Sequence, residues 1–264
     1  MSKAGFFTTM AVAVLTGFLG VGPAGAETPT CSAPGNLMRF DRAIFHTAAR
    51  IAEGRSLKIV ALGSSSTQGI GATSPANSYP SRLEAELREQ YPDMQIEVIN
   101  RGVGGEDARE ELARLDKSVL SERPDLVLWQ VGTNAIVDEE GISNEAYLIR
   151  KGLARLKAAG VDVILIDPQY SPAVVGRPKA GAMVRMLESV AQGANVPVFR
   201  RYAIMNHWRT VENLPFDRFI VKDGLHMNDW SYGCIAKLLA TSIVAAASQP
   251  VPVATRSIVQ QARL

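Results

Sequence analysis

Hydrophobic residues follow two alternating patterns along the chain. Short runs of consecutive apolar residues predict buried strands at 58–62, 95–100, 125–131, 161–166 and 196–199. Between these runs, apolar residues recur every three or four positions, which predicts helices at 78–90, 106–120, 143–159 and 179–192. Two more helices are expected, at 41–53 and 229–247, together with an extended arm at 27–37 and a long irregular connection at 200–228.

This alternation of strands and helices predicts an α/β fold with a parallel sheet covered by helices on both faces. No linker or repeat divides the chain, so we expect one domain over 58–248, preceded by the arm and first helix at 27–57 and followed by a loose tail at 249–264. In such sheets, functional residues gather at the carboxyl ends of the strands.

The N-terminus is typical of a secretory signal peptide. Lys3 provides a positive charge, residues 6–21 are largely apolar, and Ala24-Gly25-Ala26 matches the small-residue cleavage pattern. We therefore expect cleavage after Ala26 and a secreted or periplasmic mature chain. No later stretch is expected to reach the roughly 20 apolar residues that a membrane span needs.

The only two cysteines are Cys31 and Cys234. In an exported protein such a pair suggests a disulfide, which here would join the N-terminal arm to the last helix. Two separate thiols, with Cys234 buried as a small apolar residue, remain the alternative.

Charge and composition argue against a nucleic-acid partner. The chain has 28 basic and 26 acidic residues, a net charge of +2, and no long basic run. Its densest basic cluster, Arg200, Arg201 and Arg209 near His207, is interpreted as a solvated loop. With 47% hydrophobic residues, the composition is that of an ordinary globular enzyme or binding domain.

A run of three serines directly follows the first predicted strand, in Gly63-Ser64-Ser65-Ser66-Thr67. A serine at the carboxyl end of a parallel strand stands where a nucleophile is expected. Such a run is more often an ordinary turn, so its meaning depends on whether the chain supplies a base.

Asp223 and His226 lie three residues apart, just before the last predicted helix. A histidine can remove the proton of a serine, and a carboxylate can orient that histidine. The alternative is a surface turn with a capping Asp. Of the other two histidines, His46 is expected to be structural and His207 has no adjacent carboxylate.

Two glycine-containing stretches follow the second and third strands. Residues 100–107 place Gly105 at the start of a helix, where backbone N–H groups can face an anion. Residues 132–135 place Asn134 where its side-chain amide can donate to an oxyanion. Each stretch alone could be a simple turn, and the glycine spacing does not match a dinucleotide-binding motif.

Together the four stretches resemble the sequence blocks of the SGNH hydrolases, which include the GDSL esterases and lipases. The blocks carry Ser, Gly, Asn and His, and the resemblance places these on Ser65, Gly105, Asn134 and His226 over residues 58–247. Two positions depart from the usual pattern, because Ser64 and Ala135 each replace an Asp. The α/β-hydrolase elbow fits less well, since Thr67 occupies the place of its last glycine.

The resemblance implies a three-layer α/β/α sandwich of flavodoxin-like, SGNH-hydrolase architecture with about five parallel strands. It also implies a serine esterase in which Ser65, His226 and Asp223 form a triad. Backbone N–H groups of Ser65 and Gly105, with the Asn134 side chain, would form the oxyanion hole. No metal or organic cofactor is expected, and the chain shows no metal-ligand cluster.

The sequence leaves the substrate and the acceptor open. Short acyl esters, acetyl groups on a polysaccharide and lysophospholipids or thioesters all fit the site, and an acyltransferase to a glycan would use the same residues. A non-catalytic carbohydrate-binding domain is the remaining alternative, and the oligomeric state is undetermined. Loops at 135–143, 168–178 and 200–222 are expected to shape the pocket. Trp129, Tyr170 and Trp208 are candidate lining residues, with core packing as an equal alternative for Trp129.

Overall fold

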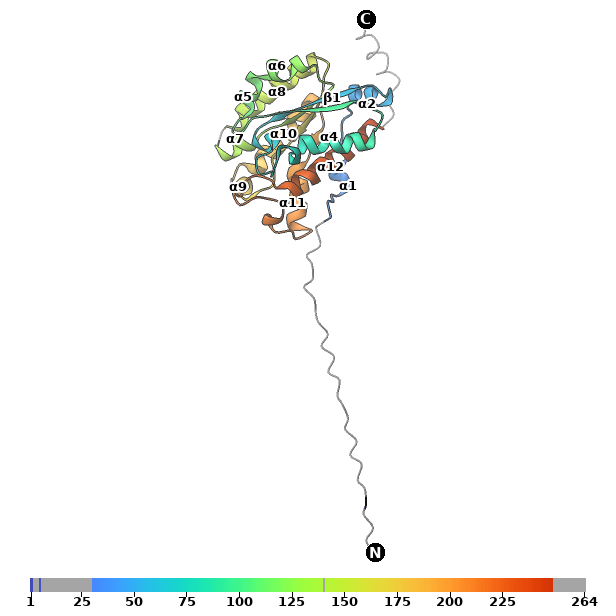
Figure 1. Ribbon diagram of the computed structural model, residues 1–264. Coiled ribbons are helices and arrows are strands. Elements are labelled where there is room, and N and C mark those ends of the chain that lie inside the picture. The colour runs from blue at the N-terminus through green and yellow to red at the C-terminus, as the bar shows by residue number, and fades with distance from the viewer. Residues whose placement is uncertain (2–4, 6–29, 140, 249–264) are drawn as a thin grey trace. The chain divides into compact units, whose positions relative to one another are not determined.

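Five parallel strands form the central sheet of the computed structural model (Figure 1). They are β1 (Leu57–Gly63), β2 (Ile96–Gly102), β3 (Leu126–Gln130), β4 (Asp162–Ile166) and β5 (Val198–Phe199). Their order in the sheet is β2-β1-β3-β4-β5, with every neighbouring pair parallel. This is the flavodoxin-like order, so the predicted fold class is confirmed.

The structure describes Met1, Gly5 and residues 30–139 and 141–248. Almost all of the predicted signal peptide and the whole predicted tail lie outside the described residues. Residues from Cys31 onward form one structural unit, distinct from Met1–Thr30, and the description below concerns that unit.

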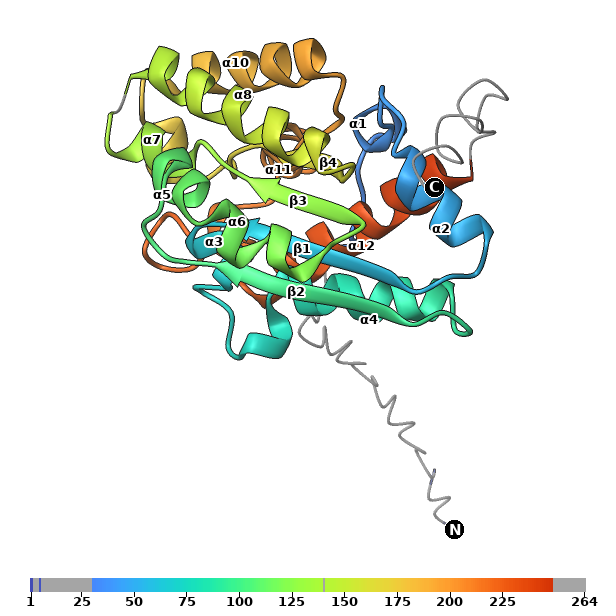
Figure 2. The ribbon, with the colours of Figure 1, turned by 90° about the horizontal axis from the view of Figure 1, so that it is seen from above.

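Helices cover both faces of the sheet (Figure 2). One face packs against α1 (Gly35–Met38), α2 (Phe45–Ala52), α4 (Tyr79–Gln90), α11 (Arg201–Thr210) and α12 (Asp229–Ala247). The other packs against α5 (Ala108–Ala113), α6 (Leu115–Ser118), α7 (Thr133–Val137), α8 (Ile142–Ala158), α9 (Pro172–Val175) and α10 (Ala180–Ala194). Side chains of β1 alternate between the two cores, with Ile59 and Ala61 in one and Val60 and Leu62 in the other.

Two sequence predictions about helices are wrong. The helix expected at 106–120 is divided into α5 and α6 at Arg114, whose side chain pairs with Glu106 and donates to the Gly63 carbonyl. The connection expected to be irregular contains α11, and Arg201, placed in a solvated cluster by the sequence, is fully buried. The buried positions of α11 include this arginine, so its inward face did not read as an apolar stripe.

Helix α12 meets the length and composition criteria for a membrane span, contrary to the sequence expectation. Its most apolar 18-residue window has a mean hydropathy of 1.3, and 61% of that window is buried inside the domain. It is the only such helix among the described residues. The helix packs on α4 and α2 and contributes Ile235, Leu239 and Ile243 to the core. Its apolar character is thus accounted for by burial in the core.

A group of polar side chains joins α2 to the sheet at the amino ends of its strands. Asp125, just before β3, accepts a hydrogen bond from Lys58 N–H over 2.8 Å and lies 2.9 Å from His46 Nε2 and 3.2 Å from Arg50 Nε. These contacts fasten α2 to the ends of β1 and β3. His46 therefore has the structural role expected from the sequence.

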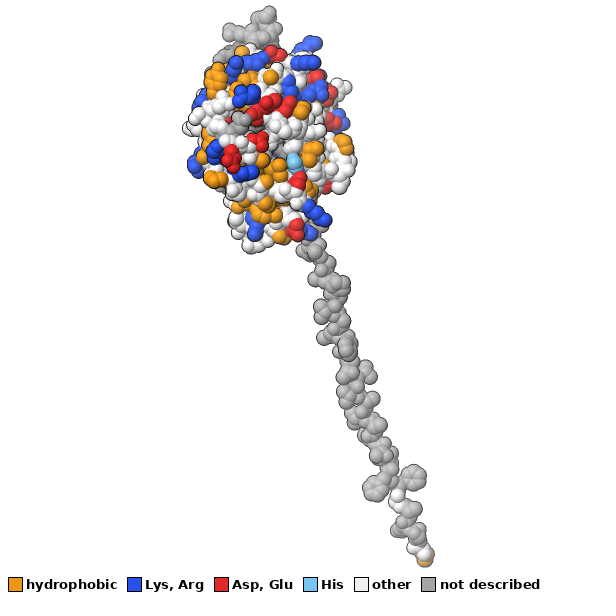
Figure 3. Space-filling model, turned by 90° about the vertical axis from the view of Figure 1, so that its left-hand side faces the viewer, with side chains coloured by type: hydrophobic (Ala, Val, Ile, Leu, Met, Phe, Trp, Pro, Cys, Tyr) orange, Lys and Arg blue, Asp and Glu red, His pale blue; other side chains and the backbone are white. Residues whose placement is uncertain are grey.

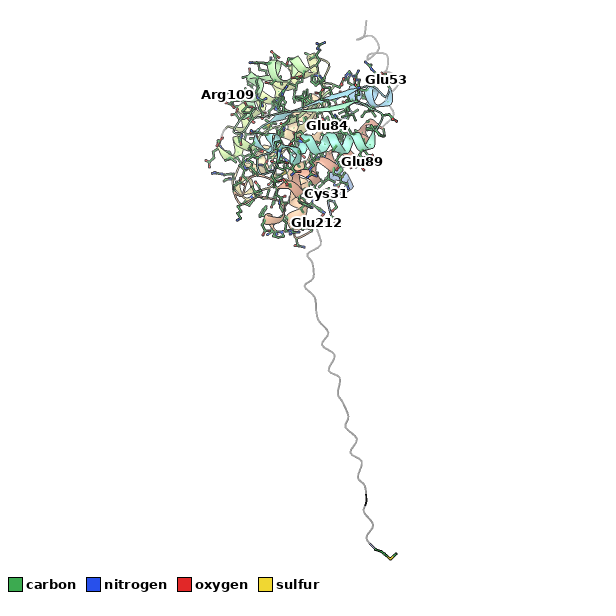
Figure 4. All side chains as sticks on the ribbon, in the orientation of Figure 1. Cys31, Glu53, Glu84, Glu89, Arg109 and Glu212 are labelled. Carbon is green, nitrogen blue, oxygen red and sulfur yellow. A yellow bond between two sulfur atoms is a disulfide. The ribbon has the colours of Figure 1, made fainter. Side chains whose placement is uncertain are left out.

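Cys31 and Cys234, which are 203 positions apart in the sequence, form a disulfide in the structure with their Cα atoms 5.3 Å apart. Figure 4 labels Cys31 beside α12, and also Glu212, whose Oε1 accepts a hydrogen bond from Ser32 Oγ over 2.6 Å. Trp208 Nε1 donates to the Ser32 carbonyl over 2.8 Å. Two kinds of contact thus fasten the start of the unit to its last helices.

Asp167, the residue after β4, fastens the sheet to the start of α11. Its Oδ1 accepts a hydrogen bond from Tyr202 N–H over 2.8 Å, and its Oδ2 is buried without a hydrogen-bond partner. Burial raises the pKa of Asp167 from 3.8 to about 7, although the Tyr202 hydrogen bond and the charge of Arg201 oppose the rise.

Removal of the disulfide is expected to lower the free energy of unfolding by about 2–5 kcal/mol, because the bond closes a very long loop in the unfolded chain. Urea titration of Cys234→Ser against the untreated protein measures this difference, and thiol counting under denaturing conditions should find no free thiol before reduction. Two free thiols in the untreated protein, with no change in stability on reduction, would refute the bond.

The pKa of Asp167 gives a second expectation about stability. Between about pH 4 and pH 7 the folded state keeps a proton that the unfolded state has lost, so this group lowers the free energy of unfolding as pH rises. Asp167→Asn cannot titrate. As pH rises through this window, the free energy of unfolding of Asp167→Asn should therefore increase relative to that of the wild type, by up to about 1.4 kcal/mol per pH unit. Above the window the difference should stay constant. Urea titrations from pH 4.5 to 8 that run parallel would contradict the assignment.

Candidate active site

The predicted site residues come together at the carboxyl-end edge of the sheet. Ser65 begins the short helix α3 (Ser65–Gln68) directly after β1, Asn134 lies in α7 after β3, and His226 lies in the loop before α12. Figure 3 shows the molecule from the side on which α5, α7 and α9 lie in Figure 1, and there hydrophobic side chains lie among acidic and basic ones.

Ser65, His226 and Asp223 form a continuous hydrogen-bonded chain. His226 Nε2 lies 2.8 Å from Ser65 Oγ, and His226 Nδ1 lies 2.6 Å from Asp223 Oδ2. The two ends of the first contact are 161 residues apart in the sequence. Because an ionised carboxylate only accepts hydrogen bonds, we assign the ring proton to Nδ1, which leaves Nε2 to accept from the serine hydroxyl.

The Asp223–His226 turn holds its own carboxylate in place. Asp223 Oδ1 accepts hydrogen bonds from the backbone N–H groups of Leu225 and His226, over 2.8 and 2.9 Å. Gly224 has φ +71°, a conformation that glycine adopts without strain. Partial burial alone would raise the pKa of Asp223, but the hydrogen bonds from His226 and Leu225 lower it below its usual value. The carboxylate is therefore ionised at neutral pH.

A buried glutamine organises the serine turn. Gln130, the last residue of β3, accepts hydrogen bonds at Oε1 from Ser64 N–H, Ser64 Oγ, Ser66 Oγ and Thr67 Oγ1, over 3.0–3.2 Å. Three of the side chains that flank Ser65 are thus turned inward, while the Ser65 hydroxyl meets the histidine. Ser64, which departs from the usual Asp, is 2% exposed and acts in this packing.

The two other predicted oxyanion donors lie in the segments that follow β2 and β3. Asn134 Nδ2 donates to the Glu106 carbonyl over 2.7 Å, which fixes the amide and leaves its second N–H for another acceptor. Gly105 has φ +85° and is exposed. The N–H of the preceding Gly104 already donates to Gln68 Oε1 over 2.9 Å.

The segment after α3 packs against the histidine loop. A Cβ added to Gly71 would lie 2.4 Å from the Met227 carbonyl and 3.1 Å from His226 Cβ, so only glycine fits there. Tyr232 Oη donates to the Ile70 carbonyl over 2.6 Å. This close approach keeps the loop that carries the histidine against the turn that carries the serine.

Two of the three aromatic residues proposed from the sequence to line the pocket are buried in the core. Trp129 and Trp208 are fully buried, and Trp129 Nε1 donates to Glu111 Oε2 over 2.6 Å. Tyr170 is partly exposed and packs 5.1 Å from the Tyr202 ring. Trp129 takes the core position given as its alternative. Trp208 was misassigned, because residue type alone does not tell which side of a helix faces the core.

Sequence reasoning also missed Gln130. A polar residue that ends an apolar strand, as Gln130 does, is the one signal that could have identified it. Among the described residues, no group of three or more His, Cys, Asp or Glu side chains is placed to hold a metal ion.

Comparisons with known proteins agree with this architecture. The model of the Non-GDSL lipase-like family matches residues 30–249. Comparison with curated proteins gave no match.

Among solved structures, a two-domain esterase active on acetylated mannans is similar with TM-score 0.67 and 19% identity over 82% of this chain and 59% of that one, so this chain spans about three fifths of it. A catalytic mutant of an acetylxylan esterase from Geobacillus stearothermophilus gives TM-score 0.62 and 19% identity over 72% of this chain and 95% of that one. A lipase/acylhydrolase from Enterococcus faecalis gives TM-score 0.58 and 25% identity over 74% and 100%.

A family match over most of the chain agrees with the parallel sheet and with the placement of the sequence blocks at one sheet edge. The replacement of the usual Asp by Ser64 also suits a family described as non-GDSL. The chain belongs to the Non-GDSL lipase-like family.

Proposed function

We propose that the protein is an exported serine esterase in which Ser65 is the nucleophile, His226 the general base and Asp223 the residue that orients the histidine. The observation that carries this proposal is the 2.8 Å contact between Ser65 Oγ and His226 Nε2, continued by the 2.6 Å contact between His226 and Asp223. A hydroxyl, an imidazole and a carboxylate in this order can activate a serine for attack on an ester.

In the proposed mechanism, His226 Nε2 takes the proton of the Ser65 hydroxyl as Oγ attacks the ester carbonyl. The ionised Asp223 stabilises the imidazolium that forms. His226 then protonates the leaving alcohol, and an acyl group remains on Ser65. Water, activated by the same imidazole, attacks the acyl-enzyme, which releases the acid and restores the serine.

The oxyanion of each tetrahedral intermediate would be held by three donors. Ser65 is the first residue of α3, so its N–H has no acceptor within that helix. The Gly105 N–H and the second N–H of Asn134 complete the set. A donor of this kind contributes roughly 3 kcal/mol to transition-state stabilisation in other enzymes.

We propose small acyl groups, acetyl foremost, on a bulky alcohol such as a glycan as the substrate class. Two observations support this choice. The Asp223 side chain is 45% exposed, so solvent reaches the triad and a large alcohol could extend outward from it. The similar structures include enzymes described as active on acetylated mannans and as an acetylxylan esterase. Exposed Ile70, whose N–H donates to the Ser65 carbonyl, offers an apolar rim beside the nucleophile.

Export is supported by the N-terminal pattern and by the cysteine pair. The positive residue, apolar stretch and Ala24-Gly25-Ala26 together read as a cleavable signal peptide. A disulfide between Cys31 and Cys234 suits an oxidising compartment.

Ser65→Ala should lower kcat for p-nitrophenyl acetate by at least about 10⁴-fold, because the nucleophile is lost while binding and the oxyanion donors remain. Steady-state kinetics on purified protein measure this effect. Ser121→Ala, whose hydroxyl donates to the Lys117 carbonyl on the surface, is the control and should keep wild-type turnover. Wild-type activity in Ser65→Ala would defeat the proposal, as would an inactive wild type across acetyl, butyryl and octanoyl esters.

Expression of the full chain in a bacterium with an outer membrane should yield an exported protein that begins at Glu27. Intact-mass measurement on the periplasmic and extracellular fractions tests this. Ala26→Arg should block cleavage, because the position before the cut accepts only a small residue. A cytoplasmic protein that retains residues 1–26 would contradict export without affecting the esterase proposal.

A further inference from the structure

A buried glutamine lies where the three loops of the candidate site meet. Gln169 is fully buried and follows β4 by three residues. Its Oε1 accepts hydrogen bonds from Thr133 Oγ1 and Arg201 Nη2, each over 3.0 Å. Its Nε2 donates to the Leu225 carbonyl over 3.3 Å. One side chain therefore contacts three separate parts of the chain.

Each of these contacts ends next to a residue of the proposed machinery. Thr133 precedes Asn134, and Leu225 precedes His226. Arg201 Nη1 continues the path to Ser66 Oγ over 3.1 Å, beside Ser65. The path thus joins the nucleophile, the oxyanion donor and the base through neighbours in sequence, without touching their reactive atoms.

The arginine in this path is costly to bury. Arg201 is fully buried, and its three hydrogen-bond acceptors are neutral: the Asp167 carbonyl, Ser66 Oγ and Gln169 Oε1. The neighbouring Asp167 carboxyl offsets part of this charge. A buried guanidinium whose hydrogen-bond acceptors are all neutral still loses more hydration energy than an apolar residue of similar size would. Stability of α11 alone gives no reason for a guanidinium here. The planar guanidinium has several donors in fixed directions, which suits a residue that holds several loops in one geometry.

We propose that Gln169 and Arg201 are positioning residues that fix Ser65, Asn134 and His226 relative to one another, with Gln169 as the junction. The proposal rests on the esterase function argued above. A displacement of about 1 Å between reacting groups can lower a rate by about 100-fold, so loss of the junction should affect the chemical step more than substrate binding.

Gln169→Met keeps the size of the side chain and removes all three hydrogen bonds. We expect kcat for p-nitrophenyl acetate to fall about 10–100-fold, with KM changed by less than about threefold. Asp125→Ala is the matched control, because it removes a buried polar junction at the opposite edge of the sheet. It should lower the melting temperature and leave kcat per folded molecule at the wild-type value.

Thr133 offers a milder pair of variants that should fold even if Gln169→Met does not. Thr133→Val is isosteric and loses the donor to Gln169, so kcat should fall about 3–10-fold, whereas Thr133→Ser keeps the hydroxyl and should restore most of the rate. In the double variant Gln169→Met/Thr133→Val, kcat should fall no further than in Gln169→Met alone, because both changes break one path.

Any one of three results would overturn the positioning role. The first is an equal kcat in Thr133→Val and Thr133→Ser, and the second is a fall in kcat for Gln169→Met that is no larger than that for Asp125→Ala. The third is a fall in kcat for the double variant equal to the product of the two single falls. Wild type and Ser65→Ala are assayed in parallel. If Ser65→Ala is as active as wild type, the proposed function fails. If Ser65→Ala is inactive while Gln169→Met and Thr133→Val keep the wild-type kcat, only the positioning proposal fails.

Discussion

The contact between the Ser65 hydroxyl and the His226 imidazole joins two loops that the fold must bring together. The two residues are 161 positions apart, and neither loop is held to the other by covalent bonds near the site. The parallel sheet brings the two loops to the same side of the domain, because the carboxyl ends of its strands lie at one edge. Packing of Gly71 against Met227 and of Tyr232 against the Ile70 carbonyl brings the two loops into contact.

Buried polar groups orient the side chains of the site. Gln130 holds the neighbours of Ser65 inward. Gln169 and Arg201 join the loops that carry the serine, the asparagine and the histidine through buried hydrogen bonds. Such groups weaken a core unless every donor and acceptor is paired. Their concentration at the carboxyl-end edge is thus explained better by the geometry of the site than by stability. At the amino-end edge, Asp125 shows that a polar junction can also serve the fold alone.

The sequence was informative where local pattern decides the outcome. Continuous apolar runs such as Ile59–Leu62 predicted the strands, and α12 begins and ends where its pattern predicted. The spacing of Asp223 and His226 predicted a local pair, which the turn at Gly224 makes. The sequence failed where tertiary contacts override local pattern. Arg201 is polar by type and buried by environment, so α11 was missed. The helix expected at 106–120 is divided at Arg114, whose side chain pairs with Glu106. The roles of Gln130 and Gln169 could not be predicted, because each depends on loops distant in the chain.

The central claim is that one hydroxyl among three consecutive serines is activated by a distant histidine. Mass spectrometry of peptides from protein treated with a fluorophosphonate tests this claim most directly, since the reagent bonds covalently to an activated serine. A single adduct on Ser65 is expected, formed rapidly in the wild type and lost in His226→Ala. An adduct on Ser64 or Ser66, or an unchanged labelling rate in His226→Ala, would contradict it.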